Sequence, residues 1–528
     1  MSVTLNQQLS ASYNETPYQS HPFPQSTPEH LHAVAVLFGI KSVPIEHARI
    51  LELGCASGGN LIPIAVRFPH AHIIGVDISS AHIAEGQATI TRLNLKNIKL
   101  QNKDLTNITK SFGEFDYIIS HGVYSWVPPE VQTAMLRICG ENLSAKGLVY
   151  ISYNTYPGWK YREVIRDAMM FRGANRATPQ ERLSYARGMI DFLHENSPPD
   201  SLTRKNIDDV LPLLKSAQDY YLLHEFLEHC NYPCYFKDFI AHSKKNKMIY
   251  LAESQPSEMF LSNFPSEIST PLLQECNGDQ VNLEQHLDFL RGRSFRQTIL
   301  IPDNRATEIN YRIEHAQLQK MHFAGIFTPI PPTAGLNSSS SFSTTYGLEI
   351  NITHPIAVVT AQILNEHYPS TRQIHTLAQE ICERSQQAGQ SQSLVDVLPV
   401  VFQFIESMII QGAIRYRNSA VELATQISEL PIKDPSACQT QLNESWITNA
   451  WHDSIQLNII EQSILPLLDG QHNFTALCEH LSQEVKNHRI IFKKQDLPIT
   501  SPEELKISIS EHLQASLISL KHKGLLAR

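Results

Sequence analysis

The glycine-rich stretch at residues 52–60, Glu-Leu-Gly-Cys-Ala-Ser-Gly-Gly-Asn, constrains the fold of this chain more than any other feature. Gly54, Gly58 and Gly59 allow a sharp backbone turn and let backbone N–H groups approach a ligand without a Cβ in the way. The stretch follows a short apolar run and precedes an amphipathic one, which places the turn between a strand and a helix. Turns of this kind bind nucleotides in α/β folds, so we expect a ligand here.

Short β-branched runs recur at regular intervals around this turn, and each predicts a buried strand. The runs are residues 48–53, 72–77, 98–104, 115–121 and 148–154. Amphipathic stretches between several of them predict covering helices, as at residues 60–67 and 80–93. Repeated units of this length favour a doubly wound, parallel sheet, so the expected fold class is α/β.

The remaining chain has a different pattern. Residues 159–227 have helical spacing, and two later runs, residues 248–253 and 297–301, predict the last pair of strands of the same sheet. A stretch rich in Pro, Gly and Ser from residue 330 predicts a linker. Beyond it, the chain twice shows an apolar helix, a glycine and a short apolar strand, as winged-helix domains do.

Composition excludes some functions. The 528 residues carry a formal net charge of -9, and Lys433 is the only Lys or Arg from residue 418 to residue 484, which argues against nucleic-acid binding. The eight cysteines have no disulfide-framework or metal-ligand spacing, so we expect reduced thiols and no metal. No leader peptide and no apolar run of membrane-spanning length is expected, which predicts a cytoplasmic protein without membrane insertion.

Three carboxylates indicate the ligand. Glu52 would repel a pyrophosphate but suits the ammonium of an amino acid, and Ala56 makes the turn a poor dinucleotide fingerprint. Asp77 ends the second strand and could accept the ribose hydroxyls, while Asp104 follows the third and could accept the adenine amino group. An adenosyl amino acid without phosphates satisfies all three, and S-adenosylmethionine is that molecule.

The expected cofactor site includes the neighbours of these acids and part of an N-terminal arm. Tyr13 and Tyr18 lie in that polar, Pro-containing arm, which could fold over the cofactor and exclude water or could be a frayed terminus. The complete expected set is Tyr18, Glu52, Gly54, Cys55, Ala56, Gly58, Asn60, Asp77, Ile78, Asp104, Leu105 and His121.

Aromatic residues follow the fourth and fifth strands, where open α/β sheets bind ligands. We expect an acceptor pocket for an amine lined by Tyr124, Trp126, Tyr153 and Tyr156, because aromatic faces stabilise a cationic centre. His121 could shape the methyl site or accept a proton, or it could simply be a strand-end histidine bonded to backbone. Asn154 could align the amine, or could be a turn residue before a proline.

Several blocks resemble bacterial protein-lysine methyltransferases with a methyltransferase regulatory domain, similar to the rickettsial enzymes that modify outer-membrane proteins. The blocks are residues 13–18, 51–61, 115–128, 151–159, 221–227 and 287–297. The resemblance implies a class I methyltransferase with a seven-stranded sheet, S-adenosylmethionine as cofactor and lysine side chains of proteins as acceptors. Outer-membrane and other envelope proteins are the substrates that it suggests. A small-molecule acceptor, or an interaction protein with a vestigial core, are the alternatives.

The expected organisation has six parts. They are an arm or lid at 1–45, a cofactor-binding core at 46–171, a helical regulatory region completing the sheet at 172–305, a linker at 306–345, and winged-helix-like modules at 346–420 and 421–528. The C-terminal domains could also form a homodimer.

Overall fold

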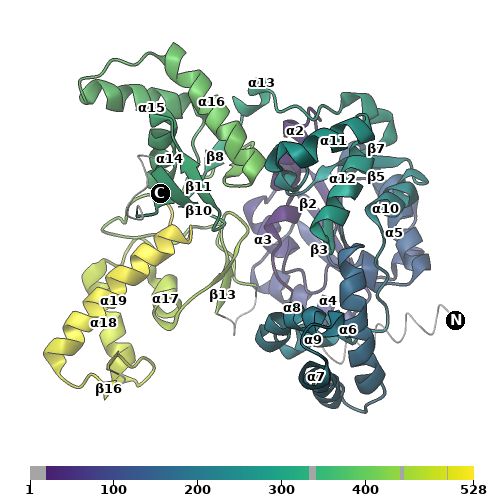
Figure 1. Ribbon diagram of the computed structural model, residues 1–528. Coiled ribbons are helices and arrows are strands. Elements are labelled where there is room, and N and C mark those ends of the chain that lie inside the picture. The colour runs from purple at the N-terminus through teal and green to yellow at the C-terminus, as the bar shows by residue number, and fades with distance from the viewer. Residues whose placement is uncertain (1–19, 332–339, 441–444, 496) are drawn as a thin grey trace.

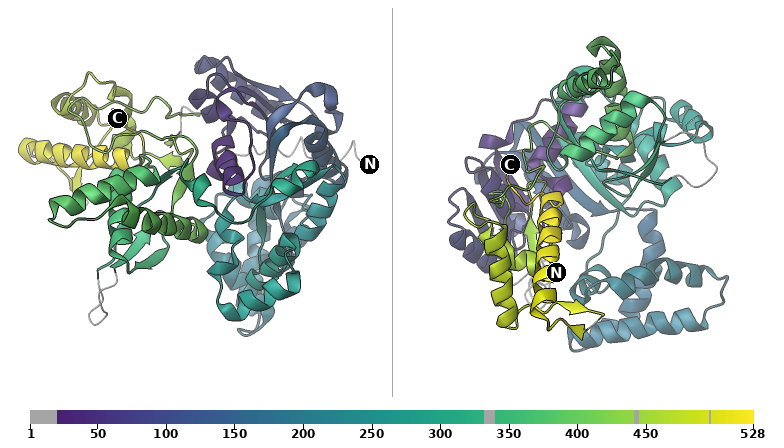
Figure 2. Two further views of the ribbon diagram at one scale, coloured as in Figure 1. Left: turned by 90° about the horizontal axis from the view of Figure 1, so that it is seen from above. Right: turned by 90° about the vertical axis from the view of Figure 1, so that its left-hand side faces the viewer.

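The computed structural model describes residues 20–331, 340–440, 445–495 and 497–528. One seven-stranded sheet forms the body of the N-terminal part, and the C-terminal modules lie beside it (Figures 1 and 2). The strand order is β3-β2-β1-β4-β5-β7-β6. The strands are β1 (Arg49–Leu53), β2 (His72–Asp77), β3 (Ile98–Asn102), β4 (Phe115–Ser120), β5 (Leu143–Asn154), β6 (Met248–Glu253) and β7 (Phe295–Pro302).

The pairing confirms the predicted α/β sheet and its last two strands. The first five strands pair in parallel, whereas β7 is antiparallel to both β5 and β6. Two strand boundaries differ from the prediction. The third strand ends at Asn102, because Asp104 caps a short turn by accepting the N–H of Thr106. The fifth strand begins five residues earlier than its apolar run, at Leu143.

Helices pack on this sheet and extend from it as an insertion. Between residues 20 and 301 the α-helices are α2 (Pro28–Leu37), α3 (Leu61–Arg67), α4 (Ser80–Arg92), α5 (Pro129–Asn142), α6 (Gly158–Gly173), α7 (Pro179–Asn196), α8 (Leu202–Ser216), α9 (Asp219–Phe226), α10 (Phe236–Lys244), α11 (Ser266–Cys276) and α12 (Gln280–Arg291). The insertion consists of helices α6 to α9, which have their own apolar core. The predicted helical region therefore forms a small unit beside the sheet.

The region expected to be an arm or lid holds a buried helix. In α2, Leu31 and Val34 have no exposed surface, and Thr27 caps the helix by accepting the N–H of His30. Only the first 19 residues of the region expected at 1–45, which include Tyr13 and Tyr18, lie outside the described residues. Residues 28–37 are thus part of the core, because their apolar positions pack on the sheet.

The interval predicted to be a linker also contains short strands. β8 (His322–Ala324) pairs with β12 (Arg415–Arg417), and β9 (Phe327–Pro329) pairs with β10 (Ser340–Thr344), which pairs with β11 (Glu349–Ile352). Buried Phe323 and Phe327 explain why these segments belong to the first C-terminal module.

The C-terminal modules are helical, as predicted. The first contains α13 (His315–Leu318), α14 (Pro355–His367), α15 (Ile374–Gln387) and α16 (Leu394–Gln411); the second contains β13 (Trp446–Thr448), β14 (Ser454–Gln456), α17 (Ile459–Ile464), α18 (Phe474–Lys486), β15 (Lys493–Lys494), β16 (Leu497–Pro498) and α19 (Pro502–His522). Contrary to expectation, α16 has the length and mean hydropathy, 1.6, of a membrane span. One of its faces, including Val397, Val401 and Ile405, is buried, and the helix packs against α14 and α15.

Candidate active site

The glycine turn between β1 and α3 is as sharp as its sequence predicts. Gly54 and Gly58 have φ values of +77° and +80°, and Ala56 also has a positive φ, +47°. A Cβ on Gly54 would lie 2.4 Å from the Cγ2 of Val123. The turn is held in place by Asp77, whose Oδ2 accepts the N–H of Ala56 at 2.9 Å.

A cavity of about 590 Å³ opens at the carboxyl ends of the parallel strands, next to this turn. Its volume is in the range of about 300–1,000 Å³ that small-molecule sites occupy. The predicted residues that line it are Glu52, Gly54, Cys55, Ala56, Asn60, Asp77, Ile78, Asp104, Leu105, His121, Trp126 and Asn154. Gly58 instead packs on Ile62 and Leu100, and Tyr18 lies outside the described residues.

Glu52 has a carboxylate oxygen that fits an ammonium group. Its Oε1 accepts a hydrogen bond from Asn60 Nδ2 at 2.8 Å, whereas its buried Oε2 has no hydrogen-bond partner among the residues that the structure describes. Burial raises the pKa of Glu52 to about 8, the Asn60 hydrogen bond opposes this rise, and Asp77 adds to it. An ammonium in the cavity would satisfy Oε2 and favour the ionised carboxylate, so this residue fits the amino-acid end of S-adenosylmethionine.

Asp77 and Asp104 both line this cavity. Asp77 Oδ1 accepts the N–H of Ser79 at 2.8 Å, and burial raises the pKa of Asp77. Each carboxylate oxygen has further acceptor capacity, so Asp77 could also accept the ribose hydroxyls. Asp104 lies in the cavity wall and is followed by the buried Leu105, which also lines it. The three acids therefore border one cavity, as the sequence predicts.

The expected aromatic pocket is only partly correct. Tyr124 is buried and its hydroxyl bonds His242 Nδ1 at 2.9 Å, while the buried Tyr153 hydroxyl bonds Thr298 at 3.0 Å. Tyr156 donates to Glu163 at 2.5 Å. None of the three lines the cavity. Tyr124 and Tyr153 instead pack against Phe239 of α10, a long-range contact that sequence spacing does not reveal.

Two tryptophans lie in the cavity wall in place of these tyrosines. Trp126 was predicted, and Trp159, at the start of α6, joins it at a ring-centroid distance of 6.0 Å and an interplanar angle of 81°. The insertion and β7 add further lining residues, none of which was predicted. They are Arg162, Tyr221, His224, Glu225, Ser294 and Phe295.

Glu225 is the member of this set with the most altered acidity. Burial raises its pKa to about 7, and the guanidinium groups of Arg162 and Arg166 partly offset that rise. Tyr221, His224 and Glu225 follow the spacing of one helical face of α9. The polar face that these three residues form on a short helix is the sequence signal that could have predicted them as cavity-lining residues.

His121 and Asn154 are both in the wall. His121 Nδ1 lies 2.9 Å from the hydroxyl of Tyr150 and 3.2 Å from Ser152 Oγ, and its ring stacks on Phe23 at 3.7 Å. Burial lowers its pKa to about 3, so His121 is neutral and fits the shaping role better than the proton-accepting one. Asn154 Nδ2 donates to Asn231, which leaves the amide oxygen to accept.

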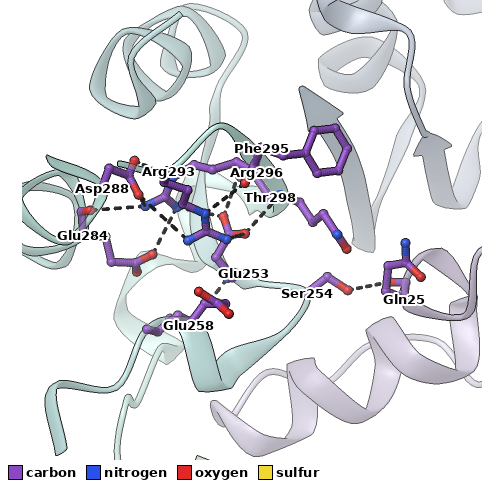
Figure 3. A network of polar contacts seen from close by, with 12 residues as sticks. Gln25, Glu253, Ser254, Glu258, Glu284, Asp288, Arg293, Phe295, Arg296 and Thr298 are labelled. Atoms are coloured by element: carbon purple, nitrogen blue, oxygen red, sulfur yellow. Dashed lines mark hydrogen bonds and ion pairs between the residues drawn. The ribbon is translucent and has the colours of Figure 1, made fainter. Parts of the chain in front are cut away.

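A buried ionic cluster holds the β6–β7 side of the cavity (Figure 3). Arg296, with no exposed surface, contacts Glu253 at 2.8 Å, Glu284 at 3.1 Å and Asp288 at 2.8 Å. Arg293 also pairs with Glu253, at 2.8 Å. Since adjacent residues of a strand face opposite ways, this anchoring of Arg296 directs its neighbour Phe295 into the cavity wall.

Three parts of the chain match known families. Residues 50–147 match a family described as "Methyltransferase domain", residues 218–301 match "Predicted methyltransferase regulatory domain", and residues 429–525 match "PKMT, C-terminal winged helix domain". An uncharacterized protein of Rickettsia prowazekii, RP789, is 32% identical over 524 residues, covering 94% of this chain and 90% of that protein. A shorter one, RP028, is 35% identical over 235 residues, 44% of this chain and 94% of its own length.

A solved structure agrees over nearly the whole chain. PKMT2 from Rickettsia typhi, in complex with AdoHcy, superposes with a TM-score of 0.84 at 28% identity, covering 97% of this chain and 100% of that one. The sheet order and the acid-lined cavity beside a glycine turn define a class I methyltransferase that uses S-adenosylmethionine. The chain belongs to the protein-lysine methyltransferase family that carries a methyltransferase regulatory domain.

Proposed function

We propose that this enzyme transfers methyl groups from S-adenosylmethionine to lysine side chains of proteins, with Glu52, Asp77 and Asp104 binding the cofactor. The observation that supports it best is that one cavity is lined both by these acids and by Trp126 and Glu225. When bound, the cofactor supplies a methyl group whose C–S bond breaks toward sulfur as the amine lone pair forms the new C–N bond. The protein then has to orient and deprotonate the amine.

We assign orientation of the lysine to the two tryptophans and deprotonation to the insertion. The faces of Trp126 and Trp159 would hold the aliphatic stem and stabilise positive charge near the amine. Glu225, with a pKa of about 7, would accept a proton from the lysine ammonium and leave the neutral amine free to attack. Asn154 would accept a hydrogen bond from the same amine through its amide oxygen.

Glu225→Gln tests this assignment against a matched control on the same helix. Asp219→Asn makes the same chemical change at an exposed position whose partner is Arg187. We expect Glu225→Gln to lower kcat about 100-fold, the low end of general-base effects, with unchanged AdoHcy affinity. The wild-type kcat/KM for the acceptor should rise with pH and level off above about 7, as Glu225 ionises. In the variant it should keep rising beyond that pH, because the lysine must then lose its proton without help, with a pKa of about 10.4.

Mass spectrometry of peptides methylated by the wild-type enzyme would identify the acceptor atom. Methyl groups found on an oxygen or on a small molecule, with none on lysine, would overturn the proposed acceptor. An unchanged kcat and pH profile in Glu225→Gln would instead remove only Glu225 from the mechanism.

We also propose that the substrates are envelope proteins that meet the enzyme unfolded in the cytoplasm, and that the C-terminal modules can form a homodimer. Large exposed apolar side chains on the insertion, including Tyr161, Phe171 and Leu202, suit contact with an unfolded chain. Faster methylation of an outer-membrane protein in urea than of the same protein folded in detergent would support the first part. Light scattering of the purified enzyme tests the second.

A further inference from the structure

His452 of the C-terminal winged-helix module contacts the cofactor site. His452 stands at the tip of the hairpin formed by β13 and β14, has no exposed surface, and contacts a residue 392 positions earlier. Its Nε2 lies 2.9 Å from Oδ1 of Asn60, the residue that precedes α3 and bonds Glu52. Figure 1 shows β13 at the junction between the C-terminal modules and α3.

The hydrogen-bond chain fixes the tautomer of His452. Asn60 Nδ2 donates to Glu52, so its Oδ1 is an acceptor and His452 Nε2 must carry the proton. His452 Nδ1 then accepts from Arg67 Nη1 at 3.0 Å, and Arg67 pairs with Glu29 at 2.8 Å. Burial, together with the charges of Arg67 and Arg417, holds the pKa of His452 well below 6.5, which agrees with this neutral form.

The hairpin tip is built to hold this one orientation. Asn449 Oδ1 accepts the N–H groups of both Trp451 and Asp453, and His452 has a left-handed φ of +65°. Trp451 is anchored in turn by its Nε1–H bond to Pro369 in the first C-terminal module. Because the tip is fixed on both sides, His452 meets Asn60 only when the modules are docked on the core.

We propose that His452 is a positioning residue of the cofactor site, through which docking of the C-terminal winged-helix module sets the affinity for S-adenosylmethionine. His452 and the N–H of Phe23 together occupy Asn60 Oδ1, which turns the Asn60 amide nitrogen toward Glu52. The amide nitrogen favours the ionised Glu52 that an ammonium needs. This proposal rests on the cofactor site assigned above, but not on lysine being the acceptor.

Neighbouring titratable groups influence the pKa of Glu52 and therefore the pH dependence of AdoHcy binding. Asp77 on β2, Cys55 in the turn and Tyr150 on β5 are the titratable groups that interact with Glu52. The hydrogen bond from Asn60 lowers the pKa of Glu52, so losing the correct Asn60 orientation should raise it further. The pH at which AdoHcy binding reaches half its maximum should therefore move upward when His452 is removed.

The test measures AdoHcy binding to the full chain by calorimetry between about pH 6 and about pH 9, with no acceptor present. His452→Ala should weaken binding about tenfold, the equivalent of one lost hydrogen bond, and should shift the pH midpoint upward. His452→Gln, whose amide can also donate to Asn60, should restore most of the affinity. Arg92→Ala removes bonds to the carbonyls of Gln439 and Thr440 in the same interface and should bind as wild type.

Thermal unfolding of each variant separates a lost contact from a lost fold. Wild-type affinity and an unshifted pH midpoint in a folded His452→Ala would overturn the proposal. An equal loss in Arg92→Ala would also overturn it, since any loosening of the interface would then suffice. An enzyme that binds AdoHcy as described but methylates no lysine would contradict only the proposed acceptor.

Discussion

Replacing Glu52 with glutamine tests two properties of the carboxylate beside the glycine turn. The first is that its ionisation destabilises the fold, and the second is that it binds the cofactor's ammonium. Burial raises the pKa of Glu52 from 4.5 to about 8. A folded-state pKa above the unfolded value means that the folded protein binds the extra proton, so this contribution favours folding at low pH. It is lost as the pH rises from about 4.5 to about 8, and Glu52→Gln removes this dependence.

The pKa difference gives the size of the effect. A single group titrating in this window changes the free energy of unfolding by about 1.4 kcal/mol per pH unit. Between about pH 5.5 and about pH 7.5, the stability of Glu52→Gln relative to wild type should therefore increase by about 3 kcal/mol. Urea unfolding of both proteins at the two pH values measures this difference, in which the contributions of all other groups cancel.

Glu52→Gln should weaken cofactor binding, although it makes the protein more stable than wild type as the pH rises. At about pH 7 most of the wild-type protein has Glu52 protonated, so binding the ammonium of AdoHcy should release close to one proton. Calorimetry in two buffers of different ionisation enthalpy measures that release, which Glu52→Gln should lack while binding about 10- to 100-fold more weakly. Equal pH slopes of stability in the two proteins, with no proton release in wild type, would refute the assignment of Glu52.

Two further outcomes are expected. Tyr124→Phe and Tyr153→Phe should each cost about 1 kcal/mol of stability through a lost hydrogen bond but leave kcat unchanged, because neither tyrosine lines the cavity; a large fall in kcat at unchanged stability would return them to the acceptor pocket. Arg296→Met should destabilise the fold by about 3–5 kcal/mol in urea, because it leaves Glu253, Glu284 and Asp288 buried around a missing cation. A variant as stable as wild type would show that those carboxylates are protonated in the folded protein.

The sequence by itself determined the sheet and the acid-lined side of the cavity. Strand periodicity and the glycine turn are local properties, and the carboxyl ends of parallel strands meet at one edge, so Glu52, Asp77 and Asp104 had to converge once the fold was correct. The membership of Asn60 and His121 in the wall follows in the same way. Ala56 adopts the positive φ that the turn requires although it is not a glycine.

Only the tertiary structure decided the acceptor side of the cavity and its link to the C-terminal module. Glu225 and Tyr221 line the cavity from a helix some 100 residues beyond Trp126 in the sequence. His452 contacts Asn60 although 392 positions separate the two residues. Tyr124 and Tyr153, which lie nearer in sequence, are buried against Phe239 of α10 instead. Contacts of this range depend on how separate units pack, and no local periodicity or turn chemistry encodes which face one unit presents to another.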